Sequence, residues 1–213
     1  MASDRVADEV RAALAAADDE GATLIERAEM LMEMAMGLQH KPKSPDHLRS
    51  AVELYDRALT ICPEDEQLLR ARITARKGTA LQVIPEQGTA SLELARAAFE
   101  AAVPTLIDFG RPEELAEAEM NLGLVVQTLA GAGRARITDA ISAYQRALRT
   151  FDKLRHPREF AILQSNLATA FLSMPFTDER GKMREALAVQ AFEEGLKVVN
   201  MIDHPAEIGR AHV

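Results

Sequence analysis

The chain has 213 residues, of which 47% are hydrophobic and 4% aromatic, with one Cys, no Trp and a formal net charge of −8. This composition excludes an intrinsically disordered chain and suits a folded one that buries roughly 70% of its unfolded surface, while the lone Cys62 excludes an internal disulfide and a Cys-based metal site. The acidic balance argues against nucleic acid or a membrane surface as partner, because the attraction to phosphate would be missing.

The acidic excess lies in the first third of the chain. Residues 1–66 contain 15 Asp and Glu against 7 Lys and Arg, whereas the residues after them contain 18 of each. The N-terminal sequence lacks an apolar core of the secretory type, and no apolar run approaches the roughly 18 residues that span a membrane. We therefore expect a cytoplasmic location.

Strong helix formers dominate the composition, and alternating runs of Val, Ile and Thr are absent, which predicts an all-α fold. The pattern predicts an N-terminal capping helix over residues 4–17 and then four helix pairs. In chain order the pairs cover residues 21–38 and 46–61, 64–84 and 89–108, 112–130 and 137–154, and 157–172 and 183–201. The sequence PAEIGRAHV at the end starts a further helix and then stops. This unfinished end suggests a homo-oligomer formed through the C-terminal end, a partner protein, or a longer parent chain.

The first predicted pair contains the sequence EMLMEMAMGL, residues 29–38, with four of the nine methionines. Alternate residues of a helix are about 200° apart, so Met30 and Met34 lie nearly opposite Met32 and Met36. The favoured interpretation is a helix that packs on two neighbours, since Met fills irregular gaps in a core. A Met-lined surface for an apolar client and a copper-type site of a metal or cofactor chaperone are the weaker alternatives, and we expect no bound cofactor.

The second helix of each pair carries a repeated stripe, Ala-x3-aromatic-x2-small, whose positions i, i+4 and i+7 share one helix face. The four copies are Ala51/Tyr55/Ala58, Ala95/Phe99/Ala102, Ala140/Tyr144/Ala147 and Ala188/Phe192/Gly195. They start 44, 45 and 48 residues apart. A fixed period of this kind predicts a stacked array of helical hairpins.

The first helix of each pair carries a matching column of small residues. Gly78, Gly123 and Ala168 follow one another at intervals of 45 residues. A proline that suits the first turn of a helix stands at or just before each predicted start from the second pair onward. These prolines are Pro63, Pro112, Pro157 and Pro205.

This arrangement resembles the tetratricopeptide repeat (TPR), whose first helix (helix A) carries Leu-Gly and whose second (helix B) carries Ala, an aromatic and Ala. The best match is NLGLVVQ (121–127) with DAISAYQRAL (139–148). The resemblance covers residues 22–202, with repeats of about 45 residues instead of 34 because the connections between helices A and B are long. It implies a right-handed α-α superhelix in one domain, residues 1–213. Its expected parts are a cap (1–20), repeats (21–62, 63–109, 110–155 and 156–202) and a stub (203–213).

The resemblance also implies a binding groove on the helix A side. In related TPR grooves an Asn just before Leu-Gly or Leu-Ala bonds the backbone of an extended ligand, which makes Asn121 and Asn166 the best candidates. An amide donates and accepts hydrogen bonds at once, although bonding to a neighbouring helix explains these residues equally well. The full predicted groove is Arg72, Arg76, Thr79, Gln82, Glu117, Asn121, Gln127, Ser165 and Asn166.

Other candidate features have simpler structural explanations. The basic cluster of Arg70, Arg72, Arg76 and Lys77 is either a solvated face or a grip for an acidic peptide. The sequence GAGRAR (131–136) has no strand before it and is expected to end a helix rather than bind phosphate. His156 precedes a proline and is expected to form a turn. No nucleophile–base pair and no metal-ligand spacing is found, so we expect no enzyme.

The sequence therefore favours a non-catalytic scaffold or assembly factor that holds a segment of a partner protein in its groove. The main alternative is a TPR regulator that senses a peptide or another ligand. Such regulators usually carry an effector domain, and none is recognised in these residues.

Overall fold

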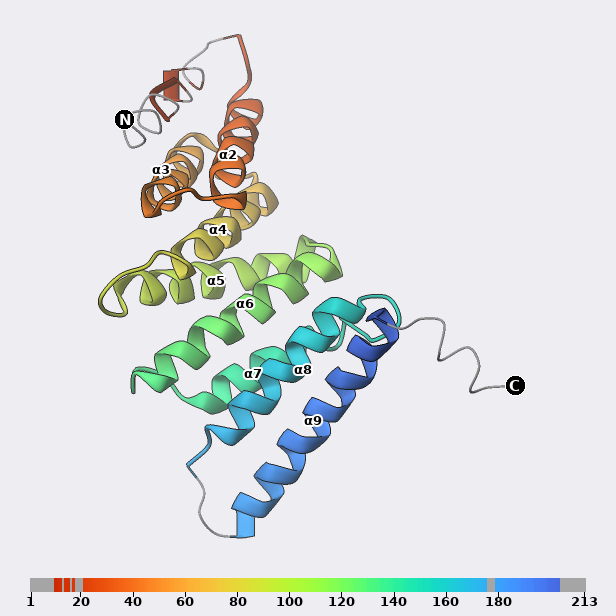
Figure 1. The fold of residues 1–213 in the computed structure, drawn as a ribbon. Coiled ribbons are helices and arrows are strands. Elements are labelled where there is room, and N and C mark those ends of the chain that lie inside the picture. The colour runs from red at the N-terminus through yellow and green to blue at the C-terminus, as the bar shows by residue number, and fades with distance from the viewer. Residues whose placement is uncertain (1–9, 13, 16, 18–20, 176–178, 204–213) are drawn as a thin grey trace. The chain divides into compact units, whose positions relative to one another are not determined.

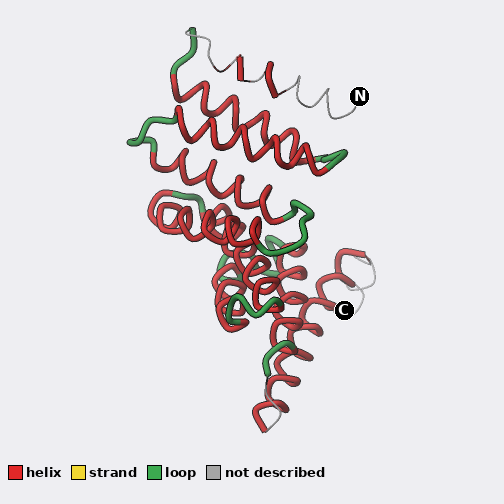
Figure 2. Tube along the Cα trace, turned by 90° about the vertical axis from the view of Figure 1, so that its left-hand side faces the viewer, coloured by secondary structure: helices red, strands yellow, loops and turns green. Residues whose placement is uncertain are grey.

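The fold is all-α in the part of the chain that the computed structural model describes, residues 10–12, 14, 15, 17, 21–175 and 179–203 (Figure 1). Figure 2 shows helices joined by loops and no strand among these residues. The helices are α2 (Leu24–His40), α3 (Pro45–Ile61), α4 (Gln67–Gln82), α5 (Ala90–Phe109), α6 (Pro112–Gly131), α7 (Ile137–Ala147), α8 (Pro157–Leu172) and α9 (Glu179–Asp203). The described residues of the predicted capping helix, which lie between 10 and 17, are helical. Its other residues lie outside the described part of the chain. The predicted stub after residue 203 lies outside them too.

Consecutive helices pair as hairpins, which confirms the expected fold class. The hairpins are α2/α3, α4/α5, α6/α7 and α8/α9. They form two compact units, one up to Arg111 and one from Pro112 onward. Within each unit the second helix of the first hairpin packs on the first helix of the next, and the two first helices, α2 with α4 and α6 with α8, also touch. Each unit is therefore two stacked hairpins.

The aromatic ring of helix B packs against the small residue of helix A in the same hairpin. Phe99 and Tyr144 are fully buried. A Cβ added to Gly78 would lie 3.0 Å from Cζ of Phe99, and one added to Gly123 would clash with the ring carbons of Tyr144. The glycines thus let each ring enter the space between the two helices, as the repeated spacing predicts.

Two of the rings also make a hydrogen bond across their hairpin. The hydroxyl of Tyr55 donates to Oε1 of Gln39 at 2.9 Å, and that of Tyr144 donates to Oε1 of Gln127 at 2.7 Å. Burial raises the pKa of both tyrosines above the ordinary value, so both stay protonated donors at neutral pH. Phe99 has no hydroxyl and provides packing alone.

The fourth ring differs from the prediction. Phe192 on α9 is 38% exposed, whereas Tyr55, Phe99 and Tyr144 are fully buried. The equivalent Tyr144 of α7 packs against Gly123 of α6 and donates to Gln127 of the same helix. The stripe of α9 does not bury its ring to the same extent.

Helix α7 is shorter than predicted, ending at Ala147 instead of continuing to residue 154. The chain tightens there because Thr150 and Phe151 both donate to the carbonyl of Ala147. The carboxylate of Asp152 then accepts the N–H groups of Leu154 and Arg155, each at 2.9 Å. These hydrogen bonds, that of the Arg155 N–H first, lower the pKa of Asp152 to about 2. The Asp152 carboxylate therefore stabilises a turn at residues for which the sequence pattern predicts a helix.

Side chains and glycines close the other helix ends. Thr23 and Glu26 form a capping box at the start of α2. Arg70 donates to the carbonyls of Leu59 and Cys62 at 2.9 and 2.7 Å, and so caps the C-terminus of α3. The predicted turn after α6 is also present. Its Gly133 has φ +70°, and the N–H of Arg134 bonds the Leu129 carbonyl at 2.8 Å.

The methionine stretch lies on α2 and packs mainly inside the first unit. Met30, Met32 and Met36 are half-buried against its core. Met34 is 38% exposed. The arrangement fits a helix with neighbours on two sides.

Candidate functional site

The predicted groove residues fall into two sets, one in each unit. Arg72, Arg76, Thr79 and Gln82 lie on α4 of the first unit. Glu117, Asn121 and Gln127 lie on α6 and Ser165 and Asn166 on α8, both in the second unit. Each set is described by itself.

In the first unit, Arg76 lies at a shallow hollow of about 290 Å³ beside the end of α2. Met36, Gln39 and His40 complete its lining. Arg72 lies one turn before Arg76 on α4, and both are half-buried. The hydroxyl of Thr79 donates to the Ala75 carbonyl of its own helix at 3.2 Å.

The basic cluster is divided between two roles. Arg70 caps α3, as described above, and Lys77 forms an ion pair with Asp56 of α3. These two side chains hold α4 against α3, as the structural explanation requires. Arg72 and Arg76 remain on the helix A side, with Arg76 lining the hollow.

In the second unit the two asparagines have different surroundings. Asn121 is only 8% exposed, so little of its amide reaches the surface. Asn166 is half-buried and its neighbour Ser165 is exposed. The Nδ2 atom of Asn166 is buried and makes no hydrogen bond, although it carries two protons to donate. Asn166 is thus the better of the two candidates.

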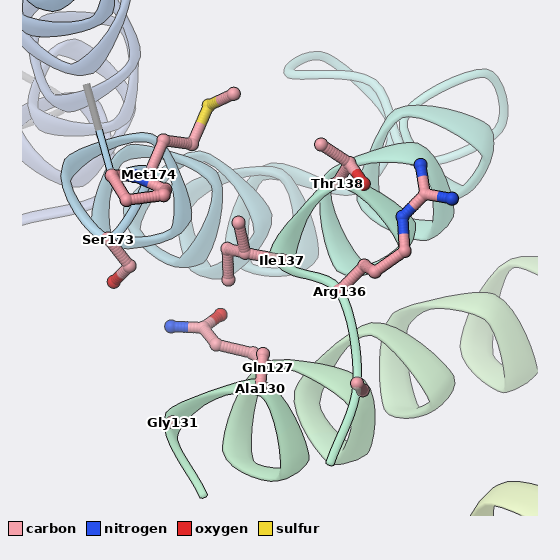
Figure 3. Close-up of a pocket in the computed structure, with 10 residues that line it drawn as sticks. Gln127, Ala130, Gly131, Arg136, Ile137, Thr138, Ser173 and Met174 are labelled. Atoms are coloured by element: carbon pink, nitrogen blue, oxygen red, sulfur yellow. The ribbon is translucent and has the colours of Figure 1, made fainter. Parts of the chain in front are cut away.

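Gln127 bonds a buried tyrosine and also lines a pocket. Its Oε1 accepts the hydroxyl of Tyr144, which fixes the amide. The same side chain lines a pocket of about 510 Å³ between α6, the α6–α7 loop, the start of α7 and the end of α8 (Figure 3). Ile137, Met174 and Pro175 give the pocket apolar walls, and its polar groups belong to Gln127, Arg136, Thr138 and Ser173.

Two exposed apolar residues on α8 extend this surface, and the sequence prediction missed them. Ile162 is 49% exposed and Leu172 is 48% exposed. Ile162, Asn166 and Thr169 follow at i, i+4 and i+7, so they share one face of the helix. Leu172 is one turn beyond Thr169, next to the pocket residues Ser173 and Met174. We call Ile162, Asn166, Thr169 and Leu172 the α8 stripe.

A signal for these residues was present in the repeat spacing. Ile162 stands 45 residues after Glu117, and Leu172 stands 45 residues after Gln127. At both positions the earlier repeat carries a polar residue and this repeat carries an apolar one. The substitution indicates that the helix A surface is more apolar in this repeat. The pocket gave no such signal because it depends on the conformation of the α6–α7 connection.

An ion pair links α6 and α7 in the second unit. Arg146 of α7 donates two hydrogen bonds of 2.7 Å to the carboxylate of Glu119 on α6. Only 3% of Glu119 is exposed. The hydrogen bonds to Glu119 raise the pKa of Arg146. The ion pair joins α6 to α7.

Comparisons with known proteins support the fold. No protein-family model matches the chain, and no curated protein matches it by sequence. Among solved structures, the crystal structure of MamA, a TPR-containing protein, is similar with a TM-score of 0.54 and 17% identity, over 83% of this chain and 76% of that one. The fold is therefore a TPR-like helical repeat.

None of the described helices is both long and apolar enough to cross a membrane. Residues 10–12, 14, 15, 17, 21–175 and 179–203 contain no group of three or more His, Cys, Asp and Glu that could hold a metal ion.

Proposed function

We propose that the protein is a non-catalytic interaction scaffold that binds a segment of a partner protein along the α8 stripe and into the adjacent pocket. The main support is the buried Nδ2 of Asn166, which makes no hydrogen bond, between the exposed apolar residues of that stripe. Stacked helical hairpins present extended surfaces suited to peptide segments. The TPR-like fold, often found in scaffolds, agrees with this proposal.

The dimensions of the site suit a short extended segment. Asn166 and Ser173 are seven residues apart on the same helical run, which corresponds to about 10 Å. An extended peptide covers that length in about three residues. The amide of Asn166 would then bond the peptide backbone, Ile162 and Leu172 would contact its apolar side chains, and one further side chain would enter the pocket.

The chemistry of the site predicts the kind of segment. The pocket walls are mostly apolar, and Arg136 is one of the lining residues, with its guanidinium directed away from Gln127 and Ser173 (Figure 3). An aliphatic or aromatic residue followed or preceded by an acidic one matches both features. In the first unit, Arg76 offers the same preference for carboxylates at the hollow that Met36 also lines.

A second candidate function is a regulator that senses a small ligand or a free peptide. The pocket volume of about 510 Å³ favours it, because this size is common for small-molecule sites. The two candidates differ in what enters the pocket. A scaffold binds a segment of a folded partner, whereas a regulator responds to the ligand alone.

The scaffold proposal predicts how two substitutions on the α8 stripe affect binding. Asn166→Ala and Ile162→Glu should each lower the affinity for the partner at least about tenfold, since a hydrogen bond and an apolar contact are lost. The partner is first retained from native extract and its bound segment is mapped. A synthetic peptide of that segment is then titrated against each variant by calorimetry.

The matched control is Gln145→Ala on the exposed side of α7, which removes an amide from a different face. Its affinity should equal that of the unmodified protein. Circular dichroism should show the same helix content for all variants. An unchanged affinity of both stripe variants would show that the α8 stripe is not the binding surface.

A further inference from the structure

The pocket of the second unit has a hydrogen-bond donor whose direction is fixed from inside the fold. Oε1 of Gln127 accepts the hydroxyl of Tyr144 at 2.7 Å. Burial raises the pKa of Tyr144, so the hydroxyl stays a donor and the amide cannot turn over without losing this bond. Among the residues that the structure describes, Nε2 of Gln127 has no hydrogen-bond partner. Its two protons are therefore left to donate to a ligand in the pocket.

Ser173 supplies the complementary group. Its hydroxyl donates to the carbonyl of Thr169 at 2.9 Å, so its proton is used within the end of α8 and its lone pairs stay available to accept. Figure 3 shows the amide of Gln127 directed toward the side of the pocket where Ser173 lies. A donor and an acceptor at one end of the pocket match a ligand group that both accepts and donates. A hydroxyl does so, whereas a carboxylate only accepts.

The walls of the pocket suit an aromatic ring next to that hydroxyl. Ile137, Met174 and Pro175 are apolar, and the thioether of a methionine makes favourable contacts with aromatic rings. The pocket volume of about 510 Å³ leaves room for a large side chain. The guanidinium of Arg136 is directed away from the polar end (Figure 3), so that end is neutral. A ring that ends in an uncharged hydroxyl is the side chain of tyrosine.

The first unit repeats the tyrosine–glutamine bond beside a hollow of different chemistry. Tyr55 donates to Oε1 of Gln39 at 2.9 Å, and Gln39 lines the hollow. The other lining residues are His40, Arg76 and a single apolar residue, Met36. This hollow therefore lacks apolar walls on several sides, and the preference for tyrosine belongs to the pocket of the second unit.

We propose that the side chain that enters the pocket is a tyrosine of the partner segment, whose hydroxyl accepts from Nε2 of Gln127 and donates to Oγ of Ser173. This inference rests on the proposed function and names the residue that the same site recognises. Tyr144 acts as a positioning residue, because it holds the Gln127 amide and does not touch the ligand. A phosphorylated tyrosine does not fit, since its charge would enter a neutral end without a facing cation.

An NMR titration of the full chain with single-residue probes tests this inference. N-acetyl-L-tyrosinamide should cause saturable amide shifts at the start of α7 and the end of α8, with a Kd on the order of 1 mM. N-acetyl-L-phenylalaninamide lacks only the hydroxyl and should bind at least about fivefold more weakly. The phosphorylated tyrosinamide should bind more weakly still. Equal affinities of the first two probes, no saturable shift, or tighter binding of the phosphorylated probe overturns the proposal.

Two substitutions test which groups recognise the hydroxyl. Ser173→Ala and Tyr144→Phe should each bring the affinity ratio of the tyrosine and phenylalanine probes close to one, while the affinity for the phenylalanine probe stays the same. Ser142→Ala is the matched control, because Ser142 makes the same kind of bond, 2.9 Å to the carbonyl of Thr138, on the exposed side of α7 and does not line the pocket. Its ratio should equal that of the unmodified chain. A full tyrosine preference in both Ser173→Ala and Tyr144→Phe overturns the assignment.

The probes separate this inference from the proposed function. Ile162 lies eleven residues before Ser173 on the same helical run, which corresponds to about 16 Å, so a single residue in the pocket does not reach it. Loss of partner affinity in the α8 stripe variants without a tyrosine preference overturns this inference alone. A tyrosine preference with unchanged partner affinity in those variants supports this inference and contradicts the proposed binding along the α8 stripe.

Discussion

At the scale of single residues, the Tyr144–Gln127 pair links the packing of the second unit to its pocket. Replacing Tyr144 by Phe keeps the ring and removes the 2.7 Å hydrogen bond. We expect Tyr144→Phe to lower the free energy of unfolding by about 1 kcal/mol, the usual contribution of such a bond. Urea denaturation followed by circular dichroism measures it. A change above roughly 3 kcal/mol would mean that the ring itself is misplaced.

Gly123 tests the close approach of ring and helix more severely. A methyl group at this position would overlap the ring of Tyr144, and overpacking of this kind costs about 1–3 kcal/mol. Gly131→Ala on the same helix is the matched control, because an added Cβ there meets no atom within 4 Å. We expect Gly123→Ala to lower the urea midpoint and Gly131→Ala to leave it nearly unchanged. Equal midpoints would contradict the ring-on-glycine packing.

The sequence predicted burial correctly for the aromatic residues that have the same neighbours in each repeat. Tyr55, Phe99 and Tyr144 are buried as the 44- and 45-residue spacing predicts. Phe192 is half-exposed although its stripe has the same pattern, so the stripe alone does not determine burial. The groove residues follow the same rule. Asn121 and Asn166 occupy equivalent positions, yet the first is nearly buried and the second is half-exposed.

At the scale of elements, helix ends depend on contacts that periodicity does not contain. The predicted bounds of α6 and α8 agree with the structure within one residue. Helix α7 ends seven residues early, where the Asp152 carboxylate collects two backbone N–H groups. The sequence Asp-Lys-Leu-Arg (152–155) is compatible with a helix as well as with a turn. Periodicity alone therefore does not predict where α7 ends.

The C-terminus of α3 gives a prediction at this scale. Arg70 reaches from α4 to the carbonyls of Leu59 and Cys62, and a cation at this end also interacts favourably with the helix dipole. We expect Arg70→Ala to destabilise the first unit by about 1–2 kcal/mol. Thermal unfolding measures the loss.

The control for Arg70 is Arg49→Ala on α3. Arg49 forms only an exposed ion pair with Asp46, and such pairs contribute little to stability. Its midpoint should remain within experimental scatter of the unmodified protein. If both variants behave alike, Arg70 does not cap α3 in solution.

At the scale of the whole molecule, the repeated hairpin accounts for the surface proposed to bind a partner. Within each unit the second helix of the first hairpin packs on the first helix of the next, α3 on α4 and α7 on α8. The helix A side of the second unit carries the α8 stripe. The groove on the helix A side stays a prediction, and the sequence predicted the hairpins. It missed the pocket, because the pocket requires the path of the α6–α7 connection.

The central claim, that the α8 stripe binds a partner segment, is tested most directly by photo-cross-linking. A photoreactive phenylalanine analogue replaces either Ser165, beside Asn166 on α8, or Gln145 on the exposed side of α7. Each variant is irradiated in the native extract, and the cross-linked peptides are identified by mass spectrometry. We expect the variant at position 165 to cross-link one recurring partner segment that contains an apolar and an acidic residue. The variant at position 145 should cross-link no such segment. The same segment captured from both positions, or capture from position 145 alone, would contradict it.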